Sequence, residues 1–264
     1  MKLPIYQVDA FTSKLFSGNP AAVCPLPSWL PDETLQKIAA ENNLSETAFF
    51  VPDENPTTLR WFTPKAEVDL CGHATLATGF VYFNILFPTK TEVRFASASG
   101  ELVVRKPDEL LALDFPCQPA VPWAPACDLA AILGTAPIEI LRTESYALVR
   151  VASEQQILGL KPDFKALADL DVIGCIVTAP GSSCDFVSRF FAPRVGIDED
   201  PVTGSAHCTL VPYWEEKLGK SEFHARQLSP RGGELFCTRE GSRVIIRGQA
   251  VLYLEGSITL EDLA

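Results

Sequence analysis

Glu46 is a carboxylate whose place in the sequence suits proton transfer. It lies between the end of a predicted helix and the short apolar strand expected over residues 48–51. A carboxylate at such a boundary is partly removed from water, which raises its pKa toward the range of a general base. Glu46 is therefore a candidate acid/base, and the alternative interpretation is an exposed loop glutamate.

His73 follows Gly72 at the start of an apolar segment of helical length, residues 73–87. Helix N-termini present free N–H groups that attract anions. His73 could act as an acid/base or donate to a substrate carboxylate, or it could only cap the helix. Cys71 and His73 are metal-binding residue types, but no second pair has the usual zinc spacing, so no metal site is predicted.

The segment from Asp200 to Ser205 repeats this arrangement of a glycine before a helix. Pro201 holds Asp200 in an extended conformation. Asp200 and Ser205 are candidate site residues, although a carboxylate before a helix is also favoured by the helix dipole alone. His207 falls inside the helix and is interpreted as structural.

Asn19 lies in the segment Gly18-Asn19-Pro20, which predicts a turn whose amide could bind a ligand. The chain has no Gly-x-Ser-x-Gly motif, no Walker lysine motif and no Gly-x-Gly-x-x-Gly after a strand. We therefore expect no nucleotide or flavin.

An internal repeat with a period of about 130 residues organises these elements. Residues 62–69 (FTPKAEVD) resemble residues 191–198 (FAPRVGID), and Gly72-His73-Ala74 resembles Gly204-Ser205-Ala206. Each copy combines an amphipathic helix, strands and the Phe-x-Pro segment. The repeat predicts two lobes with a cleft between them, and clefts are favoured ligand sites; the alternative is chance similarity of short strings.

Hydrophobic patterns predict mostly strands, with connections that look antiparallel, and few helices. A helix is expected from Asp32, as its cap, to Asn42. The segment 73–87 is apolar all round, so we expect a helix wrapped in sheet, and a less buried helix over 205–218. The prediction is an α+β fold of two pseudo-symmetric lobes, 1–117 and 118–264, in which the last strand could return to the first lobe.

Composition restricts the class of partner. The 264 residues include 22 Lys+Arg and 33 Asp+Glu, a net charge of −11, which argues against nucleic acid and anionic membranes. The 8 cysteines form no CxxC pair and favour a reducing compartment. The N-terminus has no apolar signal region, and no apolar run is long enough to span a membrane. We expect a soluble cytoplasmic protein.

Five ordered motifs together resemble the phenazine biosynthesis PhzF-like family, within the diaminopimelate-epimerase superfamily, over nearly the whole chain. The motifs are residues 8–12 (VDAFT), 18–23 (GNPAAV), 44–49 (LSETAF), 71–75 (CGHAT) and 200–206 (DPVTGSA).

The resemblance implies two lobes, each a mostly antiparallel sheet or barrel around a central helix, and a cofactor-independent isomerase that forms a homodimer. The best understood reaction of the family moves a proton within trans-2,3-dihydro-3-hydroxyanthranilate. On this basis Glu46 removes and returns the proton, and His73, Asp200 and Ser205 assist. We expect a small carboxylate substrate, bound by Asn19, Ser45, Gly72 and Gly204.

Related racemases and epimerases use two cysteines, and this chain departs from them. Cys71 matches the first cysteine position, but the second copy offers Asp200-Pro201 instead, and Cys208 lies farther along the helix. Glu46 also has no acidic equivalent near Cys175. Two alternatives to the isomerase stay open: an epimerase or racemase that uses Cys71, and a binding protein without turnover.

Overall fold

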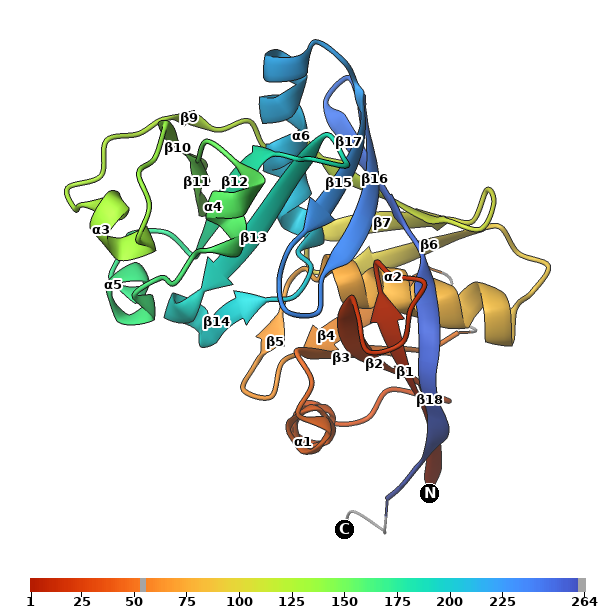
Figure 1. Cartoon of the computed structure of the whole chain (residues 1–264). Helices are drawn as coiled ribbons and strands as arrows, with labels where there is room; N and C mark the ends of the chain where they lie inside the picture. The colour runs from red at the N-terminus through yellow and green to blue at the C-terminus, as the bar shows by residue number, and fades with distance from the viewer. Residues whose placement is uncertain (53–55, 261–264) are drawn as a thin grey trace. The chain divides into compact units, whose positions relative to one another are not determined.

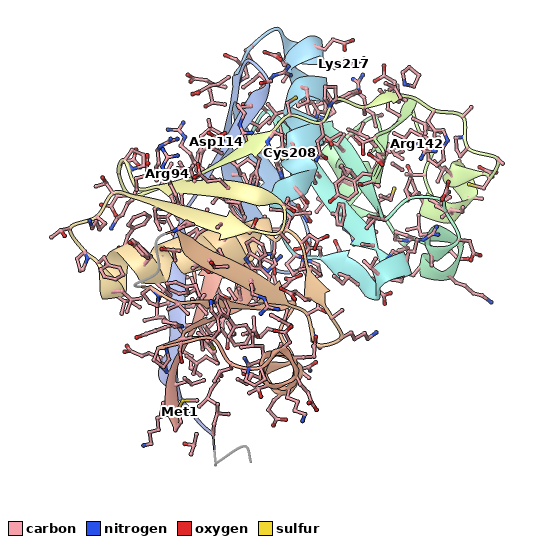
Figure 2. All side chains as sticks on the ribbon, turned by 180° about the vertical axis from the view of Figure 1, so that it is seen from behind. Met1, Arg94, Asp114, Arg142, Cys208 and Lys217 are labelled. Atoms are coloured by element: carbon pink, nitrogen blue, oxygen red, sulfur yellow. The ribbon has the colours of Figure 1, made fainter. Side chains whose placement is uncertain are left out.

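The computed structural model describes residues 1–52 and 56–260 and contains two compact units (Figure 1). Unit 1 comprises residues 1–114 and 247–264, and unit 2 comprises residues 115–246. The chain passes from unit 1 to unit 2 within strand β8 (Leu111–Pro116) and returns within strand β17 (Arg243–Gly248). Asp114, which is labelled in Figure 2, is the last residue of the first segment of unit 1. The division into lobes at residues 117 and 118 stays a prediction.

The strands of unit 1 form a mixed sheet in which antiparallel pairs predominate. The antiparallel pairs are β18–β1, β1–β2, β3–β4, β4–β5, β6–β7 and β7–β8, and the parallel pairs are β2–β3 and β4–β6. The bounds are β1 (Lys2–Ala10), β2 (Asn19–Pro25), β3 (Glu46–Phe50), β4 (Thr57–Phe62), β5 (Glu67–Val68), β6 (Glu92–Ser97), β7 (Gly100–Arg105) and β18 (Ala250–Thr259).

Helix α2 (Gly72–Val81) is the central helix of unit 1. It contacts β1, β2, β3, β7 and β18 of the same unit, and all its residues except Phe80 are buried (Figure 1). This is the expected environment of a helix that is apolar on every side. A π-helical turn, Tyr82–Leu86, continues it, whereas the amphipathic helix α1 (Asp32–Asn42) buries only one face.

The strands of unit 2 pair in the same order as β1 to β7. The antiparallel pairs are β9–β10, β10–β11, β12–β13, β13–β14 and β15–β16, and the parallel pairs are β11–β12 and β13–β15. The bounds are β9 (Val121–Pro122), β10 (Glu139–Arg142), β11 (Tyr146–Arg150), β12 (Gly174–Pro180), β13 (Phe186–Ala192), β14 (Ile197–Asp200), β15 (Glu222–Gln227) and β16 (Gly233–Glu240).

Helix α6 (Gly204–Leu218) is the long helix of unit 2, and Cys208 marks it in Figure 2. It packs on β16, the indole of Trp214 donates to Thr178 on β12, and the same indole stacks on Phe186 of β13. Pro212 lies within the helix, as the sequence requires. The short helices are α3 (Leu129–Leu133), α4 (Glu154–Leu158) and α5 (Phe164–Ala168), with a 3-10 turn at Pro193–Val195.

Each unit has its own hydrophobic core. In unit 1 buried side chains of β2, β3 and β4 pack against the apolar face of α1, with Leu35 and Phe49 fully buried. In unit 2 a second cluster includes Leu133, Val177 and Phe191. Among the described residues no helix is long and apolar enough to cross a bilayer.

Three local expectations are corrected. Asn19 and Pro20 belong to β2, where they pair with Ala10 and Asp9 of β1, instead of forming a turn. Asp32 lies in the first turn of α1, and Pro31 occupies its N-cap position without a side-chain hydrogen bond. The helix expected over 73–87 is α-helical only to Val81, because a π-helical turn follows.

Candidate active site

Three element ends meet in unit 1. Asn19 is the first residue of β2, Glu46 is the first residue of β3, and His73 is the second residue of α2. Because β2 and β3 are parallel neighbours, with Ala21 opposite Glu46, their N-terminal ends lie at one edge of the sheet. The helix α2 packs on both strands and brings its own N-terminus to that edge.

Gly18 fixes the entry of the chain into β2. Its φ of +68° lies in the left-handed region, which side chains other than hydrogen disfavour. A Cβ at this position would also lie 2.2 Å from the carbonyl oxygen of Ala10 on β1. Only glycine fits here, and the tight entry places Asn19 at the start of the strand.

Glu46 and His73 form a buried acid/base pair. The Nε2 atom of His73 lies 3.0 Å from Oε2 of Glu46, and the two side chains are 6% and 10% exposed. The contact is close, but neither atom makes an aligned hydrogen bond within the described residues. Both atoms therefore keep bonding capacity for a third group. The interpretation of Glu46 as an exposed loop residue is wrong, and His73 does not cap its helix.

The other ring nitrogen of His73 has two partners. Nδ1 lies 3.1 Å from Nδ2 of Asn19 and 3.5 Å from Sγ of Cys71. The amide of Asn19 can serve either form of the ring, since its NH2 donates to neutral imidazole and its oxygen, after a flip, accepts from imidazolium. The same side chain can thus hold His73 in place while a proton comes and goes.

Burial and charge act on both neighbours of Glu46. Burial disfavours the imidazolium form of His73, but Cys71 and Glu46 outweigh this and raise the pKa of His73 above its usual value. Burial, together with the Glu46 carboxylate, raises the pKa of the Cys71 thiol to about 11. His73 is therefore a proton donor near neutral pH, whereas Cys71 stays a thiol.

The N-terminus of α2 lacks a side-chain cap. Cys71 occupies the N-cap position without a side-chain hydrogen bond to the helix, and the first turn contains no acidic residue. Gly72 is buried there, and Ser45 is half-buried immediately before β3. The predicted ligand-binding residues Ser45 and Gly72 thus flank the two acid/base residues in the sequence.

In unit 2 Asp200 ends β14 within a buried hydrogen-bonded turn. The hydroxyl of Thr203 donates to Oδ2 of Asp200. The side chain of Gln227, which is fully buried, accepts from the backbone N–H of Thr203 at 2.9 Å and donates to the carbonyl of Asp200 at 2.7 Å. Gln227 therefore fixes the turn that carries Asp200 to Gly204, the first residue of α6.

Ser205 has a partner that matches the one of His73 in unit 1. Its Oγ lies 3.0 Å from the hydroxyl of Tyr146, the first residue of β11. Asn19 begins β2 and Tyr146 begins β11, the equivalent strand of unit 2. Each contacts the second residue of the long helix that follows in its unit, His73 of α2 and Ser205 of α6. Burial raises the pKa of Tyr146; the Ser205 hydrogen bond opposes this, and Asp200 adds to it.

Two more residues of α6 are buried next to these groups. The Nδ1 atom of His207 lies 2.9 Å from the carbonyl of Thr203, and burial lowers its pKa to about 4. Burial raises the pKa of the Cys208 thiol to about 12. His207 is thus a neutral helix residue, as the sequence indicated.

The structure brings Asn19, Glu46 and His73 into direct contact in unit 1. In unit 2 it places Asp200, Gly204 and Ser205 on one turn and helix start. Sequence reasoning missed Tyr146 and Gln227. Tyr146 could have been found by asking which residue opens the strand equivalent to β2, whereas no local pattern marks Gln227.

Comparison with known proteins identifies the family of the chain. Residues 8–256 match the family described as phenazine biosynthesis-like protein. An uncharacterized isomerase of Pseudomonas aeruginosa is 52% identical over 98% of this chain and 100% of its own length. The crystal structure of a PhzF-family phenazine biosynthesis protein from Enterococcus faecalis is 48% identical, with a TM-score of 0.94, over 98% of this chain and 100% of that one.

A more distant likeness concerns the fold alone. A hydroxyproline epimerase from Agrobacterium vitis shares 13% identity with a TM-score of 0.61, over 99% of this chain and 94% of that one. With the strand pairing in each unit, this confirms the predicted α+β class of the diaminopimelate-epimerase type.

Proposed function

Because the chain belongs to the phenazine biosynthesis-like protein family, we propose that it is an isomerase that moves a proton within a small carboxylate substrate without a cofactor. Its relatives at 52% and 51% identity carry the name isomerase. The observation that carries the proposal is the buried Glu46–His73 pair, whose facing atoms are 3.0 Å apart without an aligned hydrogen bond.

Glu46 is the base in this proposal. Its carboxylate takes a proton from one substrate carbon and returns it to another. A general base has to lie within hydrogen-bond reach of the proton it removes, and Glu46 Oε2 has no aligned partner that competes for this role. The low-dielectric surroundings strengthen its interaction with the reacting atoms.

His73 supports the charge that develops on the substrate. Its raised pKa favours the protonated form, which donates a hydrogen bond to the anion that forms when the proton leaves. Asn19 keeps the ring oriented through Nδ1. A base and a donor held side by side by their surroundings are a recurrent arrangement for acid/base chemistry.

The substrate carboxylate needs a local partner, since a net charge of −11 repels anions overall. The N-termini of α2 and α6 both lack a side-chain cap and acidic residues in the first turn. We propose that backbone N–H groups at Gly72 in unit 1 or at Gly204 in unit 2 bind the carboxylate, and that Ser45 of unit 1 contributes to this binding. Asp200 and Ser205 contribute polar contacts. In its most specific form, the proposal is that the substrate resembles trans-2,3-dihydro-3-hydroxyanthranilate. It also includes a homodimer and a location in the cytoplasm.

A second candidate is an epimerase or racemase, favoured by the 3.5 Å contact between Cys71 Sγ and His73 Nδ1. Stereoinversion of that kind needs a thiolate. The raised pKa values of Cys71, about 11, and of Cys208, about 12, oppose it. A third reading is a binding protein that retains these residues without turnover.

Proton exchange distinguishes the three proposed functions. Small carboxylate metabolites are incubated with the protein in D₂O, and deuterium uptake is followed by mass spectrometry. Isomerisation predicts uptake together with a shifted double bond, and stereoinversion predicts uptake with an unchanged skeleton. Binding of a metabolite without any exchange across the panel would refute the enzyme.

The Cys71→Ala variant separates the first two readings. If Glu46 is the base, the variant still exchanges deuterium into the substrate found in the screen. If the Cys71 thiolate is the base that removes the proton, this exchange is lost. The Cys24→Ala variant removes a buried thiol from strand β2, away from the candidate site, and controls for the effect of removing a sulfur from the core.

A further inference from the structure

Cys71 has no part in the proposed proton transfer, yet it lies in a cluster of three different ligand types. One ligand atom each from Glu46, Cys71 and His73 lies within 4.8 Å of the others, and all three side chains are buried. Sulfur, imidazole nitrogen and carboxylate oxygen are the donors that Zn²⁺ and Co²⁺ take in proteins. The fold adds Glu46 to the Cys71–His73 pair, which spacing alone left without a partner.

The distance between the sulfur and the ring nitrogen fits a shared ion. Zn–S bonds of about 2.3 Å and Zn–N bonds of about 2.0 Å at a tetrahedral angle place the two ligand atoms about 3.5 Å apart. Cys71 Sγ and His73 Nδ1 are 3.5 Å apart. These two atoms can therefore hold one ion once the Asn19 amide, whose nitrogen lies 3.1 Å from the same Nδ1, turns away.

Glu46 can complete the set. Its Oε2 faces Nε2 of His73 at 3.0 Å but has no aligned hydrogen bond that would hold it there. A carboxylate oxygen of Glu46 lies within 4.8 Å of the other two ligand atoms, and metal binding requires it to turn from Nε2 to the ion. Cys71 binds as a thiolate, its proton leaving to solvent, so a divalent cation with one thiolate, one carboxylate and neutral imidazole forms an uncharged buried cluster.

We propose that Glu46, Cys71 and His73 form an inhibitory site for a thiophilic divalent cation such as Zn²⁺. The ion binds without any role in turnover. Its inhibitory effect rests on the proposed function, because the ion engages the carboxylate that has to accept the substrate proton. Ion binding itself does not depend on that function.

Cobalt absorption tests the binding. Co²⁺ is added to the purified full chain, and the thiolate-to-cobalt charge-transfer band in the near ultraviolet is titrated. The wild type is expected to show a saturable band equivalent to one ion, which Zn²⁺ displaces. Cys71→Ala should lose this band, while Cys24→Ala and Cys127→Ala, at a buried and an exposed thiol, should keep it. Circular dichroism tests whether each variant is folded. If Cys71→Ala does not fold, Cys71→Ser replaces it in the titration.

Two results would overturn the site: no saturable band in the wild type, or a band that persists in Cys71→Ala. The exchange assay provides the second arm. Zn²⁺ should suppress deuterium uptake by the wild type over the range in which it displaces Co²⁺, and displacement without suppression would refute the inhibitory effect. A protein that binds Co²⁺ through Cys71 yet never exchanges deuterium would instead refute the proposed function and leave the metal site standing.

Discussion

Two buried histidines have pKa values shifted in opposite directions by their surroundings. His73 has the carboxylate of Glu46 at 3.0 Å, and its pKa is raised. His207 has a carbonyl at Nδ1, the ring of Phe186 nearby and no facing carboxylate among its described partners, and its pKa is lowered to about 4. The residue types were visible in the sequence. The sign of each shift was not, since it depends on the contact that the fold makes between His73 and Glu46 and on the burial of His207, which outweighs the opposing Thr203 hydrogen bond.

The lowered pKa of His207 predicts a pH-dependent stability. The unfolded chain binds a proton at His207 near pH 6.5, but the native chain does so only near pH 4. Below pH 6.5 the unfolded state is therefore favoured increasingly, until both states are protonated below about pH 4. This shift corresponds to about 3 kcal/mol of unfolding free energy, fully present above pH 6.5.

Urea unfolding of wild type and His207→Gln measures this effect. The stability advantage of the wild type should shrink by about 3 kcal/mol between neutral pH and about pH 4. An advantage that is constant across this range would show that His207 is not buried in its neutral form.

At the scale of elements, the candidate site depends on where strands and helices begin. The apolar run of β3 and the apolar helix α2 could be predicted from their patterns, and so could Glu46 and His73 at their starts. The start of β2 could not, because Gly18 and Pro20 indicate a turn while the pairing of Pro20 with Asp9 makes a strand. The buried turn before α6 could not be predicted either, since its partner Gln227 lies on β15.

Loss of the Gln227 amide should destabilise unit 2. Gln227→Leu keeps an apolar volume but leaves the N–H of Thr203 and the carbonyl of Asp200 buried without this partner. Each of these two groups costs about 1–3 kcal/mol, so the unfolding free energy should fall by about 2–6 kcal/mol. Gln155→Leu, on an exposed face of α4, is the matched control and should change stability little. Equal stability of the two variants in urea unfolding would contradict the role given to Gln227.

At the scale of the whole molecule, both units pair their strands in the same order, yet their chemistry differs. The contact of Asn19 with His73 corresponds to that of Tyr146 with Ser205, but β12 has Cys175 near the position that Glu46 occupies in β3. The sequence pattern led us to expect two similar lobes, and the internal repeat and its origin by duplication stay predictions. The net charge of −11 is a property of the entire chain and explains why an anionic substrate would need local N–H groups.

The central claim is that one carboxylate, Glu46, takes and returns the proton. The direct measurement is the rate of isomerisation by Glu46→Gln, with Glu41→Gln, an exposed residue on α1, as the matched control. The account predicts that Glu46→Gln folds normally and loses at least about 10²-fold in turnover, while the control is unaffected. Near-normal turnover in folded Glu46→Gln would contradict it.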